Sequence, residues 1–321
     1  MNVLVTGAGG MVGSHMVEQL YNAGHNVIGI WHKNRKNIEQ ITVPIRFVQC
    51  DIRYGYGLEE LIMDNLPDQI FHLAAQSYPT VSWSSPAETI DVNINGTVAV
   101  YEAIKKARKY VKADYDPMVV VACSSAEYGE TLNKLEGNDV YVKETAELLP
   151  LHPYGVSKVG QDLISFQYFM NDHIRCIRAR IFNSTGTRKV NDVTSDFTKR
   201  AIEAERSGIW ELRVGNLETR RAIMDQRDLV NALMLLADKG KPGDAYNISS
   251  EYVFQMKEIV DMIEKKLKHT FKINIDRTLF RNTDEKIIVG DVTKLKKETG
   301  WRQNISMEQT ITDMLNYWRS I

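Results

Sequence analysis

The sequence predicts an α/β fold in which a doubly wound parallel sheet is followed by a smaller α/β domain. Short apolar runs alternate with segments of helical periodicity through the first half of the chain. This alternation is typical of a parallel sheet with helices on both faces. A glycine-rich turn joins the first apolar run to the first helical segment. The 321 residues are enough for about two domains that each bury a core.

The predicted strands are short apolar runs of the kind that lie buried in a sheet. In chain order they are Val3–Val5, Val27–Ile30, Arg46–Val48, Ile70–Leu73, Met118–Ala122 and Cys176–Ile181. Helices are predicted around Val12–Leu20, at Ile94–Val111, from Pro153 onward, at Val230–Leu236, at Met256–Leu267 and after Trp301. Beyond residue 183 glycines divide the chain into shorter units. We therefore expect a first domain at 1–182, with a return segment near 220–248, and a second domain at 183–321.

The composition is that of an ordinary globular protein and excludes several classes of partner. The 40 basic and 41 acidic side chains nearly cancel, so neither nucleic acid nor an anionic membrane surface is favoured. We expect no secretory signal and no membrane span, because no apolar run is long enough. Cys50, Cys123 and Cys176 are far apart and have no metal-binding spacing. The expectation is a cytoplasmic protein without a metal.

The first turn has the pattern of a dinucleotide site. It reads Thr6-Gly7-Ala8-Gly9-Gly10-Met11-Val12-Gly13, between a predicted strand and a predicted helix. Gly7 would permit the tight turn, Gly10 the approach of backbone to a pyrophosphate, and Gly13 close packing of helix on strand. Free amides at the helix N-terminus favour an anion. The turn therefore predicts a Rossmann-type domain, and a glycine-rich turn without a ligand is the alternative.

The end of the second strand indicates which cofactor binds. NAD sites usually have an acid there, about 20 residues past the turn, to hold the ribose hydroxyls. This chain has Lys33, Arg35 and Lys36 instead, and its first carboxylate is Glu39. Basic side chains can pair with a 2′-phosphate, so NADP is favoured. A solvated basic loop beside an NAD site is the alternative. Asp51 and Ile52, after the third strand, are expected to meet the adenine ring.

Tyr154 and Lys158 are the candidate proton-transfer pair. Residues four apart share one face of a helix. An ammonium one turn away should favour the phenolate and lower the pKa of Tyr154 from its ordinary value of about 10. Such a tyrosine can donate or accept a proton near neutral pH. Combined with the glycine turn, the pair predicts hydride transfer at a carbon–oxygen bond.

At this point the chain resembles the extended short-chain dehydrogenases/reductases along essentially its whole length. The matching segments are the glycine turn, His72-Leu73-Ala74-Ala75-Gln76-Ser77, Asp91-Val92-Asn93 with Gly96-Thr97, and Tyr154 with Lys158. Within that superfamily it is similar to GDP-mannose 4,6-dehydratases and GDP-4-keto-6-deoxy-mannose reductases. The segments typical of that branch are Val81-Ser82-Trp83, Arg180-Ile181-Phe182-Asn183, Gly215–Arg221, Asp225-Gln226-Arg227-Asp228 and Thr299-Gly300-Trp301.

The resemblance implies the remaining site residues. Ser124 becomes the third catalytic residue, which hydrogen-bonds the substrate C4 oxygen beside Tyr154, and Lys158 also reaches the nicotinamide ribose. The first domain would bind NADP and the second mainly the nucleotide-sugar, and relatives commonly form homodimers through two helices. Further cofactor contacts are expected at Met11, Val12, Leu73, Ala74 and Ala75. Substrate contacts are expected at Asn183, Lys199, Arg221 and Arg281, with a surface ion pair as the alternative for each arginine.

One departure from the family pattern distinguishes the possible reactions. A 4,6-dehydratase needs a general base that removes a proton from C5. Family dehydratases carry this glutamate two residues after the serine or threonine, where this chain has Ala126. Glu127 is adjacent, but consecutive side chains on a strand point to opposite faces. The sequence therefore favours an NADPH-dependent reductase of a nucleotide-linked, GDP-type 4-keto-6-deoxy sugar.

Three alternatives stay open at this stage. A 4,6-dehydratase could use Glu127 as its base if the local backbone were shifted by one residue. A 4-epimerase or 4-dehydrogenase needs only Ser124, Tyr154 and Lys158. A nucleotide-sugar sensor without catalysis would use the same fold, although it has no need of all three side chains.

Overall fold

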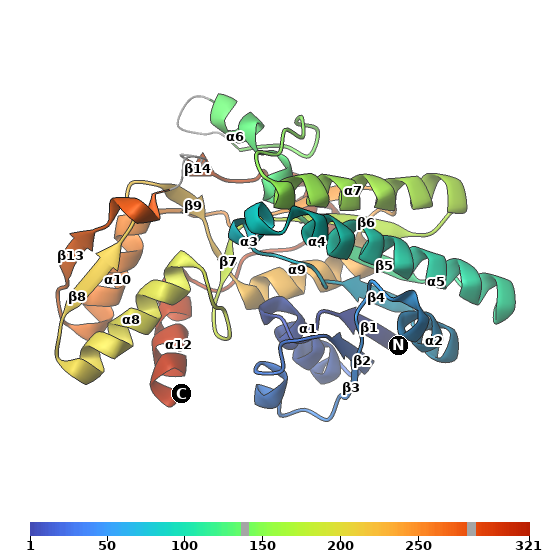
Figure 1. The fold of residues 1–321 in the computed structure, drawn as a ribbon, viewed down its shortest axis with the longest axis horizontal. Coiled ribbons are helices and arrows are strands. Elements are labelled where there is room, and N and C mark those ends of the chain that lie inside the picture. The colour runs from blue at the N-terminus through green and yellow to red at the C-terminus, as the bar shows by residue number, and fades with distance from the viewer. Residues whose placement is uncertain (136–140, 281–286) are drawn as a thin grey trace.

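The main sheet of the protein has seven parallel strands. The computed structural model describes residues 1–135, 141–280 and 287–321. The strand order is β11-β6-β5-β4-β1-β2-β3 (Figure 1). The bounds are β1 Asn2–Thr6, β2 Asn26–Trp31, β3 Arg46–Gln49, β4 Gln69–His72, β5 Met118–Ser124, β6 Cys176–Ile181 and β11 Ala245–Ile248. All six neighbouring pairs of this sheet are parallel. The predicted fold class is confirmed.

Helices cover both faces of this sheet, as the strand pattern requires. Val3 and Val5 pack on one face and Leu4 on the other, because side chains alternate along a strand. The first face contacts α1 (Met11–Asn22), α9 (Gln226–Lys239) and α11 (Thr293–Thr299). The second face contacts α2 (Gly55–Asn65), α5 (Gly96–Tyr110) and α7 (Pro153–Asp172). Figure 1 shows α5 and α7 together on one side of the strands and α1 on the other.

The helix predicted at Ile94–Val111 has a different start in the structure. A π-helical turn, η2 (Asp91–Asn95), precedes α5, after the short helices α3 (Pro79–Ser84) and α4 (Pro86–Ile90). The turn directs Asn93 inward, where its side chain accepts the N–H of Gln76 at 2.8 Å and donates to Ser157 Oγ at 2.8 Å. These bonds join the segment after β4 to α7.

A second, smaller lobe contains its own core. It is built from α8 (Val193–Ser207), α10 (Met256–Leu267) and α12 (Met307–Ser320), seen at the left of Figure 1. Small sheets complete it: β8 (Glu211–Val214) with β13 (Lys272–Ile275), β7 (Ser184–Thr185) with β10 (Met224–Asp225), and β9 (Arg220–Ala222) between β12 (Val253–Gln255) and β14 (Ile287–Ile288). The remaining elements are α6 (Glu130–Lys134) and the 3-10 turns η1 (Ile38–Gln40), η3 (Ser125–Glu127) and η4 (Arg277–Leu279).

The chain returns from the smaller lobe to the main sheet. Strand β11 pairs with β6, and α9 packs beside α1. The helix α11 and Trp301, which is 1% exposed, also belong to the core under β1. The division into domains at residue 183 stays a prediction.

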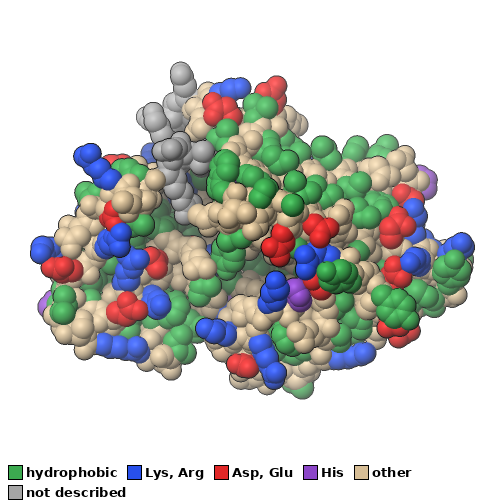
Figure 2. Space-filling view, viewed as in Figure 1, with side chains coloured by type: hydrophobic (Ala, Val, Ile, Leu, Met, Phe, Trp, Pro, Cys, Tyr) green, Lys and Arg blue, Asp and Glu red, His purple; other side chains and the backbone are tan. Residues whose placement is uncertain are grey.

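The exposed face of α7 carries an apolar stripe. Val156, Leu163, Phe166 and Met170 are 47%, 53%, 40% and 54% exposed, and their spacing places them on one helix face. Figure 2 shows hydrophobic side chains gathered over the region of α7, whereas charged side chains of both signs are scattered elsewhere on this face. In the described part of the chain no helix has the length and apolar character needed to cross a membrane.

Candidate active site

The turn between β1 and α1 has the shape of a phosphate cradle. Gly7 has φ +74°, and a Cβ there would lie 2.7 Å from Ala74 N. A Cβ on Gly13 would lie 2.2 Å from Gly7 O, whereas a Cβ on Gly10 would meet only Gly7 O, at 3.2 Å. The first turn of α1 receives no side-chain cap, so its amides remain available to an anion. These features fit the pyrophosphate of a dinucleotide.

The basic loop after β2 is tied to this cradle. The Asn37 side chain donates to Gly9 O at 3.1 Å, and the glycine at position 9 lets Asn34 O approach closely. Arg35 pairs with Glu39 at 3.3 Å and is 68% exposed. Lys33 is 4.0 Å from Glu88 and is 75% exposed. Among the described residues both cations are therefore held by exposed pairs that an incoming phosphate could replace.

Asp51 follows β3, as predicted, but its carboxylate already has partners. Arg53 binds it through Nε and through Nη2, at 3.1 and 2.6 Å, and His32 Nε2 lies 3.4 Å away. The hydrogen bonds from Arg53 lower the pKa of Asp51. Ile52 is 5% exposed and packs toward the start of α5. Contact of these two residues with adenine stays a prediction.

The structure brings Ser124, Tyr154 and Lys158 together. Ser124 ends β5, and Tyr154 and Lys158 occupy the first turns of the adjacent helix α7. The side chains of Ser124 and Tyr154 share a hydrogen bond. Lys158 Nζ lies 5.8 Å from the centroid of the Tyr154 ring. The geometry agrees with one site formed by the end of a strand and the start of a helix.

Helix α7 begins with a defined cap that orients this pair. Pro153 occupies its first turn, and His152 is the N-cap, whose Nδ1 accepts the N–H of Gly155 at 3.0 Å. The His152 ring also stacks on Tyr154, with centroids 5.8 Å apart. Proline at this position is compatible with helix initiation because the first amides have no intrahelical partner.

The expected lowering of the Tyr154 pKa is wrong. Burial raises the pKa of Tyr154 to about 12, and its hydrogen bond with Ser124 offsets only part of this effect. Burial also lowers the pKa of Lys158 to about 8. The ammonium donates to Ala122 O and to Gln161 Oε1, both at 2.7 Å, rather than to the phenol. Sequence spacing gives proximity, but it does not give the extent of desolvation.

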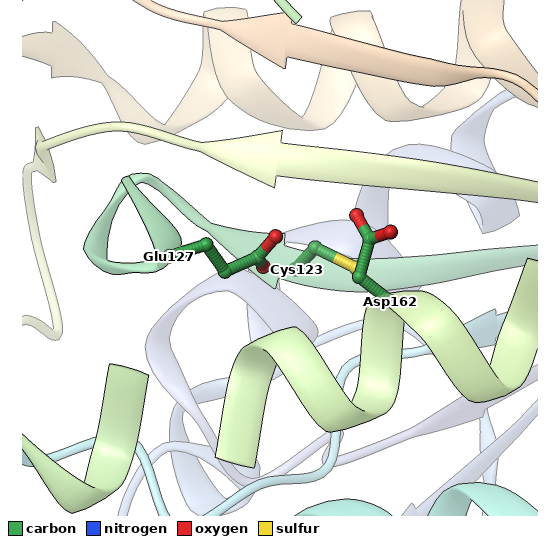
Figure 3. A group of neighbouring side chains, drawn as sticks. All are labelled: Cys123, Glu127 and Asp162. Atoms are coloured by element: carbon green, nitrogen blue, oxygen red, sulfur yellow. The ribbon is translucent and has the colours of Figure 1, made fainter. Parts of the chain in front are cut away.

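A cluster of buried charges lies directly beneath the three residues. Glu127 is fully buried, its Oε1 accepts the N–H of Ser124 at 2.8 Å, and its Oε2 lies 3.3 Å from Arg180 Nε. Asp162 accepts from Arg178 at 2.5 Å and from Arg180 at 2.9 Å. Figure 3 shows Glu127, Cys123 and Asp162 converging between β5 and α7. Their ligand atoms lie within 4.8 Å of one another, but guanidinium groups already supply the positive charge here.

Ala126 occupies the position at which the resemblance described above expects the glutamate of a dehydratase. Its N–H donates to Ser124 Oγ at 3.2 Å, and its methyl group cannot accept a proton. Glu127 does not replace it, since the turn η3 directs the Glu127 carboxyl group into the interior. A general base at either of these two positions is therefore absent.

The predicted substrate residues lie on different elements of the structure. Asn183 follows β6, and its buried Nδ2 has no hydrogen-bond partner among the described residues. Arg221 lies in β9, between β12 and β14. Lys199 lies on α8, where it pairs with Glu203 at 3.7 Å and lies 5.9 Å from the Trp318 ring. Arg281 lies outside the described residues. Contact of all four with substrate stays a prediction.

Sequence reasoning missed two supporting residues, Gln161 and His152, and the capping role of a third, Glu127. Gln161 accepts from Lys158 and donates to Thr97 Oγ1 at 2.8 Å. Its spacing of three from Lys158 could have indicated a shared helix face. His152 caps α7, and no local pattern marks it, because His is not among the preferred N-cap residues. Glu127, considered above only as a base, forms a capping box with Ser124, which the Ser-x-x-Glu spacing could have indicated.

Three comparisons with known proteins agree on the class of this chain. The family model of GDP-mannose 4,6 dehydratase matches residues 4–314. The GDP-6-deoxy-D-mannose reductase of Pseudomonas aeruginosa is 25% identical, over 99% of this chain and 97% of that protein. The GDP-mannose 4,6 dehydratase 1 of Arabidopsis thaliana is 26% identical, over 98% of this chain and 88% of that protein.

Solved structures share the fold over the whole chain. The UDP-glucose 4-epimerase of Thermotoga maritima, solved with UDP-glucose, has a TM-score of 0.87 at 24% identity and covers 100% of this chain and 99% of that one. The protein RMD of Pseudomonas aeruginosa, solved with NADPH, has a TM-score of 0.82 at 23% identity, with 99% of both chains covered. At these identities the likeness establishes the fold alone.

Proposed function

This chain belongs to the GDP-mannose 4,6-dehydratase family and is an NAD(P)-dependent nucleotide-sugar enzyme of the extended short-chain dehydrogenase/reductase type. Within that class we propose that it is a reductase. Its substrate would be a nucleotide-linked 4-keto-6-deoxy sugar, with GDP as the expected nucleotide, and NADPH would be consumed. One observation carries the choice of reaction. Ser124, Tyr154 and Lys158 converge, while the position of the dehydratase base is Ala126 and Glu127 points inward.

Tyr154 is the proton donor in this proposal. Its pKa of about 12 keeps the phenol protonated at neutral pH. Reduction of a ketone needs such an acid, because the oxygen at C4 gains a proton while the carbon gains hydride. Bound NADPH supplies the hydride and becomes NADP+. The proton lost from Tyr154 is then replaced from solvent.

Ser124 and Lys158 support the phenol. The Ser124 oxygen accepts the Ala126 N–H at 3.2 Å, so its own hydrogen is available to the ketone oxygen. Lys158, with a pKa of about 8, is mostly an ammonium at neutral pH. It can therefore donate to ribose hydroxyls while it keeps the site positive as charge develops on oxygen.

NADP is the cofactor that the basic loop supports. Lys33 and Arg35 are mostly exposed and engaged only by surface carboxylates. Guanidinium and ammonium groups suit a 2′-phosphate. The similar Pseudomonas aeruginosa structure holds NADPH. NAD is the alternative, because an exposed basic loop can also border an NAD site.

The 4,6-dehydratase is the second candidate, since several curated relatives carry that name. It requires a base that reaches C5 of the sugar. Glu127 is a poor candidate because its two oxygens face Ser124 N–H and Arg180 in the interior.

A two-substrate assay separates these reactions. Purified protein is mixed with NADPH and GDP-4-keto-6-deoxy-mannose, and separately with GDP-mannose and NADP+. The reductase predicts a fall in nicotinamide absorbance with the keto sugar and no change with GDP-mannose. Conversion of GDP-mannose into a keto sugar, without net use of cofactor, would establish the dehydratase instead.

We further propose that the chain forms a homodimer through α7. The exposed stripe of Val156, Leu163, Phe166 and Met170 would pack against its copy in a second chain. Sedimentation velocity measures this directly, and a monomer at micromolar concentration would contradict it.

A further inference from the structure

Glu127 follows the catalytic serine by three residues and forms a closed set of hydrogen bonds with it. Its Oε1 accepts the Ser124 N–H at 2.8 Å, while Ser124 Oγ accepts the Ala126 N–H at 3.2 Å. The backbone and the hydroxyl oxygen of Ser124 are therefore both fixed. With its oxygen engaged by the Ala126 N–H, the Ser124 hydroxyl lies beside Tyr154, whose pKa it lowers.

The ion pair of Glu127 with the buried guanidinium group of Arg180 is looser than its bond to Ser124. Asp162 is the nearer carboxyl group to both guanidinium groups, at 2.5 Å from Arg178 and 2.9 Å from Arg180. Arg180 Nε is farther from Glu127 Oε2, at 3.3 Å, and that oxygen has no hydrogen-bond partner among the described residues. A second buried carboxyl group costs stability unless it is well paired. Its one well-formed hydrogen bond goes to the catalytic serine.

We propose that Glu127 is a positioning residue for the reduction, which holds the Ser124 hydroxyl in place against Tyr154 through the bond to the Ser124 N–H. This inference rests on the reductase function proposed above. It gives Glu127 a role different from that of a dehydratase base, because the carboxyl group acts through Ser124 and exchanges no proton with the sugar.

The role requires an oxygen acceptor at the right distance and does not require a charge. The groups that face the carboxyl group are Cys123 from β5, Tyr154, Lys158 and Asp162 from α7, Arg180 from β6 and Tyr128 after η3. Burial, and next Asp162, raise the pKa of Glu127 well above its ordinary value. An amide oxygen accepts an N–H as a carboxyl oxygen does, so a neutral side chain of the same length should serve.

Two variants separate the acceptor from the charge. Glu127→Gln keeps an oxygen at the same reach and removes the ionisable group. Glu127→Asp keeps the ionisable group but is one methylene shorter, so its oxygen withdraws from the Ser124 N–H. We expect kcat for the keto sugar to stay near wild type in Glu127→Gln. In Glu127→Asp it should fall by about 10- to 100-fold, since a misplacement on the order of 1 Å can cost this much.

Two controls distinguish positioning from general damage. KM for the keto sugar and Kd for NADPH should change little in either variant, and both should unfold cooperatively on heating. A wild-type kcat in Glu127→Asp, or an equal loss in both variants, would overturn the proposal.

Exchange of the Ser124 amide hydrogen provides a readout that needs no substrate. Protection of this hydrogen, measured by NMR in the full chain, should be kept in Glu127→Gln and reduced in Glu127→Asp. Equal protection in both variants would refute the role of Glu127. A wild-type protein that reduces no keto sugar would refute the reductase function instead, so the two failures are distinguishable.

Discussion

Replacing Lys158 with methionine should change the stability of the protein in a way that depends strongly on pH. Lys158 is 3% exposed, and burial lowers its pKa from the ordinary 10.5 to about 8. Each pKa unit corresponds to about 1.4 kcal/mol, so keeping this ammonium charged in the interior costs roughly 3 kcal/mol of folding free energy. Methionine has a similar length and carries no charge to desolvate.

The direction of the effect follows from proton binding. Below about pH 8 the lysine is charged in both states, and the folded wild type bears the whole cost. Between about pH 8 and 10.5 the folded chain has released a proton that the unfolded chain still binds, so wild-type stability rises with pH. Above this pH range Lys158 is neutral in both states, so burying it no longer reduces the stability of the wild type. The stability of Lys158→Met relative to wild type should therefore fall by roughly 3 kcal/mol from neutral to alkaline pH.

Urea unfolding followed by tryptophan fluorescence measures this difference, with the protein free of cofactor and under reducing conditions. The bonds from Lys158 to Ala122 O and Gln161 Oε1 are lost at every pH, so they shift the difference without changing its pH dependence. Lys199→Met is the matched control, because that side chain is 54% exposed; its effect should be small throughout. A Lys158→Met difference that varies by less than about 1 kcal/mol across the pH range would refute the reasoning.

Three further outcomes are expected. Tyr154→Phe should lower kcat by about 100-fold or more while NADPH binding, measured by fluorescence, is kept, because only the proton donor is lost. Gly13→Ala should abolish tight NADPH binding in the same titration, since its Cβ would lie 2.2 Å from Gly7 O; binding at wild-type affinity would contradict this. Arg35→Ser should weaken NADPH binding by about 10-fold or more and leave NADH binding unchanged, because one charged contact to phosphate is worth about 1.5–3 kcal/mol. An equal effect on both cofactors would show that Arg35 does not contact the 2′-phosphate.

The fold was predictable because its signals are local. Apolar strands, helical spacing and the glycine turn each depend on neighbouring residues, and they placed Ser124 at a strand end and Tyr154 on a helix. The charge states were not predictable, because they depend on burial from distant segments. Arg180 and Asp162 are 18 residues apart on different elements, and the sequence alone does not pair them. The inward turn of Glu127 likewise required the backbone of η3.

The late return of the chain to the main sheet has a consequence for biosynthesis. Strand β11 is the last of the seven strands in sequence, and Trp301 closes the core beneath β1. A ribosome must therefore synthesise almost the entire polypeptide before the nucleotide-binding half can finish folding. A nascent chain that stalls near residue 240 would expose the unpaired edge of β6 and an open hydrophobic core. Unlike in a protein of two consecutive domains, truncation from the C-terminus should therefore impair both halves together.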